Sequence, residues 1–345
     1  MREQNLLAPG MRVFAAEDNN SRLIPIDSGA ALVLPTELAD YPIIEHEGRT
    51  DERIDTDWWA HLRNLLGDEI VEAGGEAWPS SHEFFADMMI VRLEEEVAQY
   101  SSEIATAKLL SHPHIRLVLS DAGVLGELRI RDLTPIGARL EDKIVVEQIP
   151  EDVASTRVLV KESGRSILCD PTRAYFSTKL QSERLETLEL AKELRSLLDR
   201  PLRVCDPFCG VGPALATLLG EPDLVGELLA TDLNPDAVEL LFDNLRRWDR
   251  KEYPVGPTPV TNLHHDRIAG LADATELQNN PELIGRWDLL LVNLPHRTIE
   301  FLPSLIPLLD RNNTSMIRGR VIVAESEIED ANEAIQNALP PRLQG

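Results

Sequence analysis

The sequence LRVCDPFCGVGPALATLLGEPDLVGELLATDLNP, at residues 202–235, predicts a strand, a glycine-containing loop and a helix, and then a second strand. The first strand ends at Asp206, the loop contains Gly210 and Gly212, and the second strand ends at Asp232. Glycines let the backbone approach a ligand closely, and a carboxylate at the end of the second strand can accept hydrogen bonds from both ribose hydroxyls. We therefore expect a nucleoside-binding crevice here, although an ordinary strand, turn and helix with structural glycines has the same pattern.

A strand, glycine loop and helix of this kind can bind either a dinucleotide or S-adenosylmethionine. The residues around the two glycines indicate which of the two ligands is favoured. A dinucleotide site uses a third glycine in the pattern G-x-G-x-x-G, and this chain has Leu215 at that position. Asp206 precedes the loop, where its carboxylate would repel a pyrophosphate and attract a ligand that carries a cationic amino acid group. The sequence therefore favours S-adenosylmethionine.

The composition is that of a globular chain of 345 residues, 43% of them hydrophobic, with room for two or three domains. No apolar run approaches the roughly 20 residues of a membrane span, and the first residues, MREQNLLAPGMR, lack the apolar core of a signal peptide. We therefore expect a cytoplasmic monomer without membrane contact. The cysteines, Cys169, Cys205 and Cys209, form no paired C-x-x-C pattern of the kind that binds a metal. The histidines, His296 and the pair at 264–265, have no third metal ligand at a suitable spacing. We therefore expect no bound metal.

The charge is strongly negative, with 59 acidic against 34 basic residues and a formal net charge of −25. Such a chain should repel nucleic acid at low salt. Either the partner is not nucleic acid, or the acidity is an adaptation to a high-salt cytoplasm, where repulsion is screened within about 3 Å at 1 M salt. The scarcity of lysine beside abundant Asp and Glu favours the second, halophile-like interpretation.

Alternating strand and helix patterns divide the chain into four expected parts. They are a small N-terminal domain (1–50), a linker and helix (51–74), an α+β middle domain (75–185) and a Rossmann-like, doubly wound α/β domain (186–345). Outside the opening stretch, strands are expected at 12–15, 22–26, 31–34, 88–93, 115–119, 127–131, 289–292 and 320–324, with strand-rich sequence at 143–160 around a loop at 150–155. Helices are expected at 58–73, 94–110, 183–198, 236–248, 299–309 and 328–339.

Four polar residues fall at the carboxyl ends of strands expected in the last domain: Asp206, Asp232, Asp273 and Asn293. In a doubly wound parallel sheet these ends lie along one edge, where ligands bind. Their convergence makes a purely structural interpretation of the glycine loop much weaker.

Six runs of sequence resemble one known family. DPFCGVGP (206–213), ATDLNPDAVELLFDN (230–244) and DLLLVNLPHRTIEFL (288–302) are similar to the class I methyltransferase domain of the archaeal and eukaryotic tRNA (guanine(37)-N1)-methyltransferases. Upstream, the runs WPSSHEFFADMMIV, HPHIRLVLSDAGVLGELRIRDL and KESGRSILCDPTRAYFSTKLQSER follow in the family's order. The resemblance covers roughly residues 75–325, and residues 1–50 are only weakly similar to the family's small tRNA-contacting domain.

The resemblance implies an enzyme that transfers a methyl group from S-adenosylmethionine to N1 of the guanine 3′ of a tRNA anticodon, at position 37. It assigns cofactor binding to residues of the loop and the strand ends: Asp206, Phe208, Gly210, Gly212, Asp232, Leu233, Asp273, Ala274 and Asn293.

The chemistry explains three residues, of which Asn293 is also among those assigned to the cofactor. Guanine N1 must lose a proton as it attacks the methyl group, and negative charge then builds on O6, so a general base and a cationic donor are needed. The resemblance makes Glu183 the base, Arg129 the donor to O6 and Asn293 the holder of the guanine edge. Without the resemblance, Glu183 is an ordinary acidic residue at a helix start and Arg129 an ordinary strand residue.

Binding of the tRNA would involve two kinds of side chain. Tyr175 and Pro295 are expected to shape the base pocket, and Arg246, Arg247 and Arg318 are expected to meet phosphates, although the first two arginines also suit a solvated helix end.

Two other functions remain open from the sequence. A wybutosine-pathway aminocarboxypropyl transferase would use the same cofactor and tRNA position, but Pro213 and the compact run Asn-Leu-Pro-His at 293–296 favour methyl transfer. A catalytically silent RNA-binding module would keep the fold and would not bind the cofactor.

Overall fold

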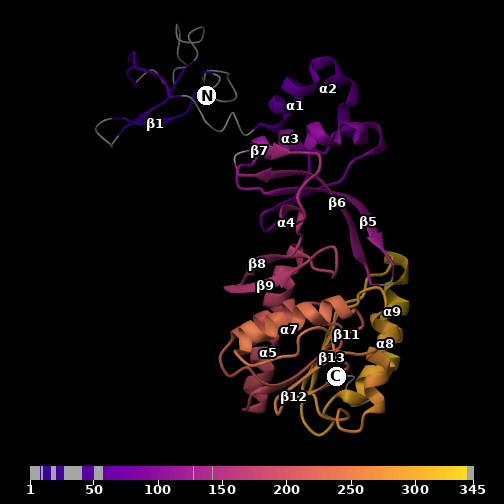
Figure 1. The fold of residues 1–345 in the computed structure, drawn as a ribbon. Helices are drawn as coiled ribbons and strands as arrows, with labels where there is room; N and C mark the ends of the chain where they lie inside the picture. The colour runs from indigo at the N-terminus through magenta and orange to yellow at the C-terminus, as the bar shows by residue number, and fades with distance from the viewer. Residues whose placement is uncertain are drawn as a thin grey trace.

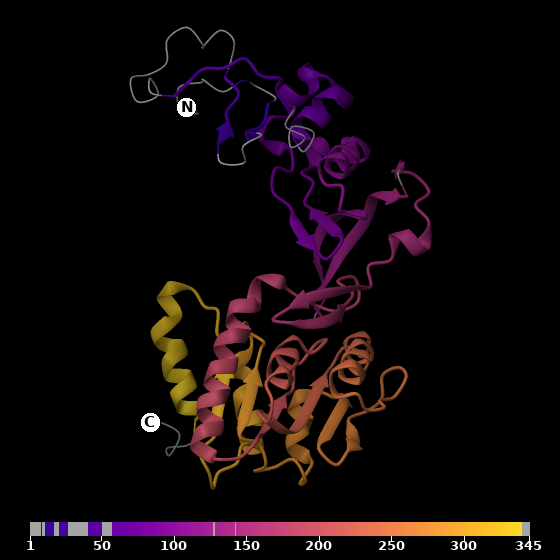
Figure 2. The same ribbon diagram turned by 90° about the vertical axis from the view of Figure 1, so that its left-hand side faces the viewer.

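The structure, a computed structural model, describes residues 8, 11–16, 21–26, 41–49, 57–126, 128–141 and 143–339. Two sheets with their helices lie one above the other, with a short hairpin between them (Figure 1). In Figure 2, the strands of the lower sheet point toward the upper part of the chain. No helix in these residues is long and apolar enough to cross a membrane.

The lower sheet has six strands in the order β12-β13-β11-β10-β14-β15. Every neighbouring pair is parallel except β12 with β13, at one edge. Strand β14, which lies between β10 and β15, is buried at all of its residues, as expected for a strand covered on both faces. The strands are β10 (Leu202–Asp206), β11 (Val225–Asp232), β12 (Thr261–His264), β13 (Arg267–Leu271), β14 (Leu289–Val292) and β15 (Met316–Gly319).

Helices cover both faces of this sheet because alternate residues of its strands face opposite sides. Val204 and Leu228 pack in an apolar cluster with α5, α6 and α7, whereas Cys205 and Leu229 pack in another with η6, α8 and η7. The predicted doubly wound α/β architecture is therefore confirmed. The helices are α5 (Gln181–Leu198), α6 (Pro213–Gly220), α7 (Pro235–Asp249), α8 (Thr298–Leu305) and α9 (Ile328–Ala338), with short 3-10 turns η6 (Ala274–Asn279), η7 (Ile306–Leu308) and η8 (Glu325–Glu327).

The strand order reverses direction between β10 and β14. From β10 the chain moves outward through β11 and β13, then returns to lay β14 and β15 on the other side of β10. A doubly wound sheet has its ligand crevice at this reversal, outside the carboxyl ends of the strands.

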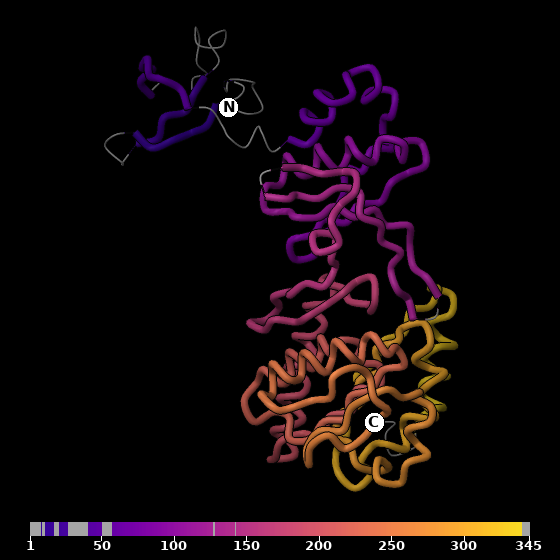
Figure 3. Tube along the Cα trace, viewed as in Figure 1, coloured from indigo at the N-terminus to yellow at the C-terminus, as the bar shows by residue number. Residues whose placement is uncertain are grey.

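The upper sheet is mixed and has the order β3-β4-β5-β6-β7. Only β4 and β5 are parallel, and α3 packs on the sheet with α1 against it. The long hairpin of β5 and β6 runs from the upper sheet down to the lower part of the chain (Figure 3). The elements are α1 (Trp58–Leu66), α2 (Asp68–Gly74), η3 (Gly75–Ala77), β3 (Glu83–Phe85), β4 (Met88–Val91), η4 (Glu95–Tyr100), α3 (Ser101–Ser111), β5 (Leu117–Leu125), β6 (Ile130–Leu140) and β7 (Lys143–Val145).

A hairpin of β8 (Val158–Glu162) and β9 (Arg165–Cys169) joins the two sheets, after the short helix α4 (Glu151–Ala154). One apolar cluster runs from Phe85 and Leu117 of the upper sheet through Ile167 of the hairpin to Val211 and Leu240 below. This shared core fixes the hairpin, and the segment that follows it, over the lower sheet.

The N-terminal part contains a two-stranded pair, β1 (Phe14–Ala15) with β2 (Arg22–Leu23). The strand expected at 31–34 and residues 51–56 of the expected linker lie outside the described residues.

Several expected elements differ from the structure. The helix expected at 58–73 is broken at Gly67, whose φ of 83° only glycine adopts readily. The strand expected at 127–131 starts too early, because β6 begins at Ile130 and Arg129 lies in the turn before it with φ of 53°. The strand expected at 320–324 is wrong: β15 ends at Gly319, and the next residues bond to the loop after β14 instead.

Candidate active site

A pocket lies at the carboxyl ends of β10, β14 and β15, against the first turns of α5. It is the crevice that the reversal of strand order predicts. Among the sequence-predicted site residues it brings together Glu183, Asp206, Asn293 and Arg318. Several other residues line it that were not predicted as site residues: Leu180, Arg184, Thr187, Ala214, Leu291, Val292, Gly319 and Arg320.

Asp206 ends β10 at the bottom of this pocket and is 2% exposed. Burial raises the pKa of its carboxyl to about 7, against a weaker lowering by the hydrogen bond from the Phe208 N–H and a further rise from Asp232. That hydrogen bond is long, at 3.4 Å. A buried carboxyl with so little hydrogen bonding would be stabilised in its ionised form by a cationic ligand group.

The glycine loop is shaped by two positive φ angles. Gly210 has φ of 54°, and a Cβ there would meet only the backbone oxygen of Tyr175, at 3.7 Å. Gly212 has φ of 87° and packs on α7, since a Cβ would lie 2.9 Å from Leu241 and 3.2 Å from Trp248. Gly210 therefore leaves space for a ligand, whereas Gly212 allows close packing of α6 on α7.

Asp232, at the end of β11, holds the loop from the next strand. Its carboxylate accepts hydrogen bonds from the N–H groups of Gly210, at 2.7 Å, and Asn234, at 2.9 Å. Burial raises its pKa, and these hydrogen bonds lower it. The remaining lone pairs of a carboxylate at this position can accept ribose hydroxyls.

The other predicted cofactor residues differ in exposure. Leu233 is 54% exposed, and Asp273 is exposed and caps η6 by accepting from the Thr275 N–H. Ala274 is buried, and Phe208 packs edge-to-face on Phe301 with ring centroids 5.0 Å apart. In the described ranges, no group of three or more His, Cys, Asp or Glu side chains could hold a metal ion.

The loop after β14 presents Asn293 at the pocket. Its shape is fixed by the segment that follows β15, because Pro295 O accepts a hydrogen bond from the Ile322 N–H at 3.0 Å. Thr298 Oγ1 also donates to the Arg320 backbone oxygen at 2.6 Å. The exposed Asn293 side chain is therefore carried on a held loop.

The first turn of α5 places Glu183 at the pocket, and two features fix that turn. Arg184 is buried and forms a bidentate pair with Glu162 of β8, with both N–O distances at 2.5 Å. Arg320 forms an ion pair with Glu183 itself. Arg318, expected to meet phosphate, instead pairs with Glu186 at 2.8 Å.

Arg129 and Tyr175 meet, although they come from different parts of the chain. The guanidinium of Arg129, in the turn between β5 and β6, lies over the Tyr175 ring, 5.9 Å from its centroid. Tyr175 is 46% exposed and lies in the segment after β9 whose backbone touches the glycine loop. The long hairpin thus brings an exposed guanidinium to the edge of the lower domain.

Arg246 and Arg247 lie in the last turn of α7, a helix of 15 residues that starts beside Asp232. At 1.5 Å per residue, this places them about 20 Å from the strand ends. Arg246 pairs with Asp243 and donates to the backbone oxygens of residues 253 and 254, both at 3.0 Å, so it anchors the connection that follows α7.

The curated proteins that are similar in sequence share one name. The tRNA (guanine(37)-N(1))-methyltransferase Trm5b of Pyrococcus abyssi is 26% identical over 229 residues, 66% of this chain and 56% of that protein. The protein of that name from Trichomonas vaginalis is 25% identical over 228 residues, 66% of this chain and 50% of its own. The chain is a homologue of the archaeal and eukaryotic tRNA (guanine(37)-N1)-methyltransferases. It spans only about half the length of these relatives, and no family model matches it.

Solved structures of these homologues share the fold. The crystal structure of Trm5b from Pyrococcus abyssi matches 98% of this chain and 84% of its own, with a TM-score of 0.62 and 21% identity. A complex of aTrm5 with tRNALeu matches 89% of this chain and 79% of its own, with a TM-score of 0.57 and 22% identity. TYW2 from P. horikoshii, in complex with MeSAdo, also reaches 0.57, with 17% identity over 81% of this chain and 86% of its own. This chain therefore shares with them its fold, in which a Rossmann-like parallel sheet is joined to a second, mixed sheet.

Proposed function

We propose that the protein is a methyltransferase that transfers a methyl group from S-adenosylmethionine to N1 of the guanine at position 37 of tRNA. One observation carries the proposal: in a chain that is similar over 66% of its length to a named enzyme of this activity, Glu183, Asp206 and Asn293 line the same crevice. Residues 1–50 would add tRNA contacts, and the two sheets would form a middle domain (75–185) and a catalytic domain (186–345). A cytoplasmic location and a monomeric state belong to the same proposal.

The residues present fit this cofactor. Asp206 is a buried carboxyl with a single, long hydrogen bond, which suits the ammonium of a methionine group. Asp232 would hold the ribose, and Gly210 leaves room beside it. Asp273 and Ala274, with Phe208 and Leu233, would line the adenine side. S-adenosylmethionine, when bound, supplies an electrophilic methyl group.

The chain's own residues would handle the proton and the charge on guanine. Glu183 would accept the N1 proton on a carboxylate oxygen, and Asn293 would hold the guanine edge. As N1 is methylated, negative charge on O6 would be met by the guanidinium of Arg129, and Tyr175 and Pro295 would bound the base. The guanine would have to leave the anticodon loop stack to reach this pocket.

The three arginines expected to meet tRNA phosphates differ in how free their side chains are. Arg318 is part of the pocket and paired with Glu186, so we propose that it organises the site more than it meets phosphate. Arg247 is exposed in the last turn of α7 and stays a candidate for phosphate contact, with Arg246 anchored beside it.

The alternative, transfer of the aminocarboxypropyl group, shares the fold, since TYW2 and aTrm5 give the same TM-score of 0.57. The sequence relatives favour methyl transfer because those named here are guanine-N1 methyltransferases. Incubation with unmodified tRNA and S-adenosylmethionine at high salt, followed by nucleoside mass spectrometry, decides between them. We expect 1-methylguanosine; an aminocarboxypropyl nucleoside would establish the alternative, and no product from several tRNAs would contradict both.

A further inference from the structure

Four aromatic rings gather on the upper sheet, away from the proposed active site. Phe84 on β3 is 43% exposed, and its ring centroid lies 4.7 Å from that of His82. The centroids of His112 and His114, which flank the turn before β5, lie 5.4 and 5.6 Å from it. We call His82, Phe84, His112 and His114 the ring cluster. An exposed phenylalanine surrounded by imidazoles offers flat faces to a planar ligand.

The charge beneath the ring cluster is positive. Lys108 of α3 is fully buried over the Trp58 ring, 3.7 Å from its centroid, and its Nζ has no hydrogen-bond partner in the described part of the chain. Burial, and then the charge of Lys108, lower the pKa of His82. The nearest carboxylate in sequence, Glu83, is paired with Arg131 at 3.0 Å. The carboxylate in the cluster's own strand is therefore neutralised by an arginine.

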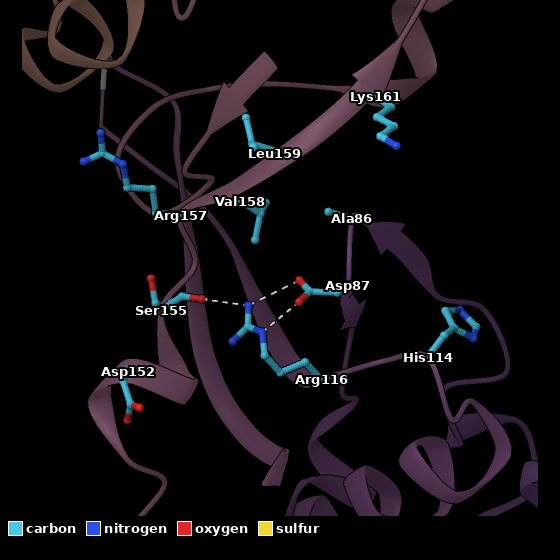
Figure 4. Close-up of a pocket in the computed structure, with 10 residues that line it drawn as sticks. All are labelled: Ala86, Asp87, His114, Arg116, Asp152, Ser155, Arg157, Val158, Leu159 and Lys161. Atoms are coloured by element: carbon cyan, nitrogen blue, oxygen red, sulfur yellow. Dashed lines mark hydrogen bonds and ion pairs between the residues drawn. The ribbon is translucent and has the colours of Figure 1, made fainter. Parts of the chain in front are cut away.

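A cavity of about 700 Å³ begins at His114 and continues between the turn after β3, α4 and β8 (Figure 4). At its centre Arg116 is held by Asp87, with Nε to Oδ2 at 2.9 Å, and by the Ser155 backbone oxygen at 3.0 Å. Lys161, on the far side of the cavity from Asp152, is exposed, and no ion pair holds it within the described residues. It is free to meet a phosphate.

We propose that the ring cluster and this cavity form a second RNA-binding surface, which takes one or two unstacked nucleotides of the tRNA outside position 37. This rests on the proposed function, in which tRNA is the substrate. Bases would stack on Phe84 and His114, and a neighbouring phosphate would meet Lys161. Stacking suits this chain, because with a net charge of −25 it gains little from long-range attraction to phosphate.

The test measures the affinity for unmodified tRNA by fluorescence anisotropy, for the full chain and for Phe84→Ser, His114→Ala and Lys161→Ala. We expect each ring substitution to weaken binding roughly tenfold. Lys161→Ala should also weaken binding and reduce the dependence of log Kd on log salt by about 0.7 to 0.9. The affinity for S-adenosylmethionine and kcat at saturating tRNA should stay unchanged, and an unchanged Tm would show that the variants are folded.

Matched controls are Leu197→Ser, an exposed apolar side chain on α5, and Lys192→Ala on the same helix. The proposed RNA-binding surface would be overturned if the controls lost as much tRNA affinity as the three variants. It would also be overturned if the three variants bound tRNA within twofold of the parent. Neither result would affect the proposed methylation activity. A parent chain that neither binds nor methylates tRNA would overturn the proposed function as well. Unchanged tRNA affinity with loss of self-association in light scattering would identify a protein interface instead, and would also overturn the proposal.

Discussion

Arg320 and Glu183 form an ion pair across the proposed active site. Glu183 lies in the first turn of α5, and Arg320 follows β15, so the pair joins two elements that are far apart in the sequence. Both side chains line the same pocket, and both are partly exposed, at 38% for Arg320 and 25% for Glu183. The carboxylate proposed as general base is thus oriented by a guanidinium before any RNA arrives, and the pair must rearrange when guanine N1 reaches it.

Substitutions of this pair should separate the base from its positioning residue. Glu183→Gln removes the proton acceptor, so we expect kcat to fall by roughly 10² to 10⁴ while the affinity for S-adenosylmethionine is unchanged. Arg320→Ala should lower kcat by about tenfold, because the carboxylate loses its orientation, and Arg320→Lys should restore part of it. Single-turnover methylation and calorimetric titration check these values. A Glu183→Gln variant with full turnover would exclude Glu183 as the base.

Cofactor affinity should depend on pH through Asp206. The pKa of this buried carboxyl is raised to about 7, and only its ionised form attracts an ammonium group. Affinity should therefore rise by up to tenfold per pH unit as pH approaches about 7 and level off above it. Calorimetric titrations between pH 5.5 and 8.5 measure this, and Asp206→Asn should bind weakly with no such dependence. If the Kd of the parent for S-adenosylmethionine does not change across this pH range, Asp206 does not bind the ammonium group of the cofactor.

The same residue links cofactor binding to stability. Its folded pKa lies above the value of 3.8 for a free aspartate, so the protonated form favours folding, and this contribution is lost as pH rises through about 7. Asp206→Asn should accordingly raise the Tm of the cofactor-free protein at pH 8 by several degrees and have little effect at pH 4.

Much of the crevice could be predicted from the sequence because strand ends are local features. Apolar runs that stop at Asp206, Asp232 and Asn293 fix where each buried strand ends, and a parallel sheet aligns these ends on one edge. The Arg320–Glu183 pair could not be predicted in this way, because it depends on how β15 is aligned beside β14 and on where α5 starts relative to both.

The errors arose where tertiary hydrogen bonds override local pattern. The apolar residues 321–323 favour a strand by composition, but the strand ends earlier because the Ile322 N–H bonds to Pro295 and the Arg320 backbone oxygen bonds to Thr298. Arg129 was expected in a strand because apolar and polar residues alternate around it, yet the preceding Gly126, with φ of 61°, begins a turn. Arg129 lies in this turn, and its guanidinium contacts the Tyr175 ring.

The contact of Arg129 with Tyr175 predicts coupled effects on turnover. Arg129→Ala should lower kcat by roughly 10² to 10³ if its guanidinium stabilises the charge on O6, and Arg129→Lys should recover little, because an ammonium lacks the planar fork. Tyr175→Phe keeps the ring and should be nearly silent, whereas Tyr175→Ala should cost about tenfold. A double-mutant cycle on kcat/KM with Arg129→Ala and Tyr175→Ala measures the coupling of the two side chains. If the two losses are additive, the stacking contact has no role in turnover.

The acidic composition predicts a strong salt dependence of folding. If the excess of Asp and Glu is a high-salt adaptation, screening of their mutual repulsion should raise the Tm as KCl increases from 0.1 to 2 M. Scanning calorimetry at fixed pH checks this, with sucrose at matched osmolality as a control for exclusion effects. A Tm that does not change over this range would favour the alternative that the charge is unrelated to salt.

Buried Lys108 predicts a substitution that stabilises the upper domain. Burial lowers the pKa of its ammonium to about 8, so at pH 7 the charged form is held in an apolar site. There its Nζ lies over the Trp58 face and has no hydrogen-bond partner among the described residues. Because the folded pKa lies below the ordinary lysine value, the unfolded state binds more protons between about pH 8 and 10.5, and the parent gains stability as pH rises through that window. Lys108→Met, of similar length and apolar, should therefore raise the Tm at pH 7 by several degrees and have a much smaller effect near pH 10.5.

Lys108→Arg serves as the control that keeps the buried charge and should not stabilise. A lower Tm for Lys108→Met at pH 7 would mean that the ammonium over Trp58 contributes more to folding than its burial costs.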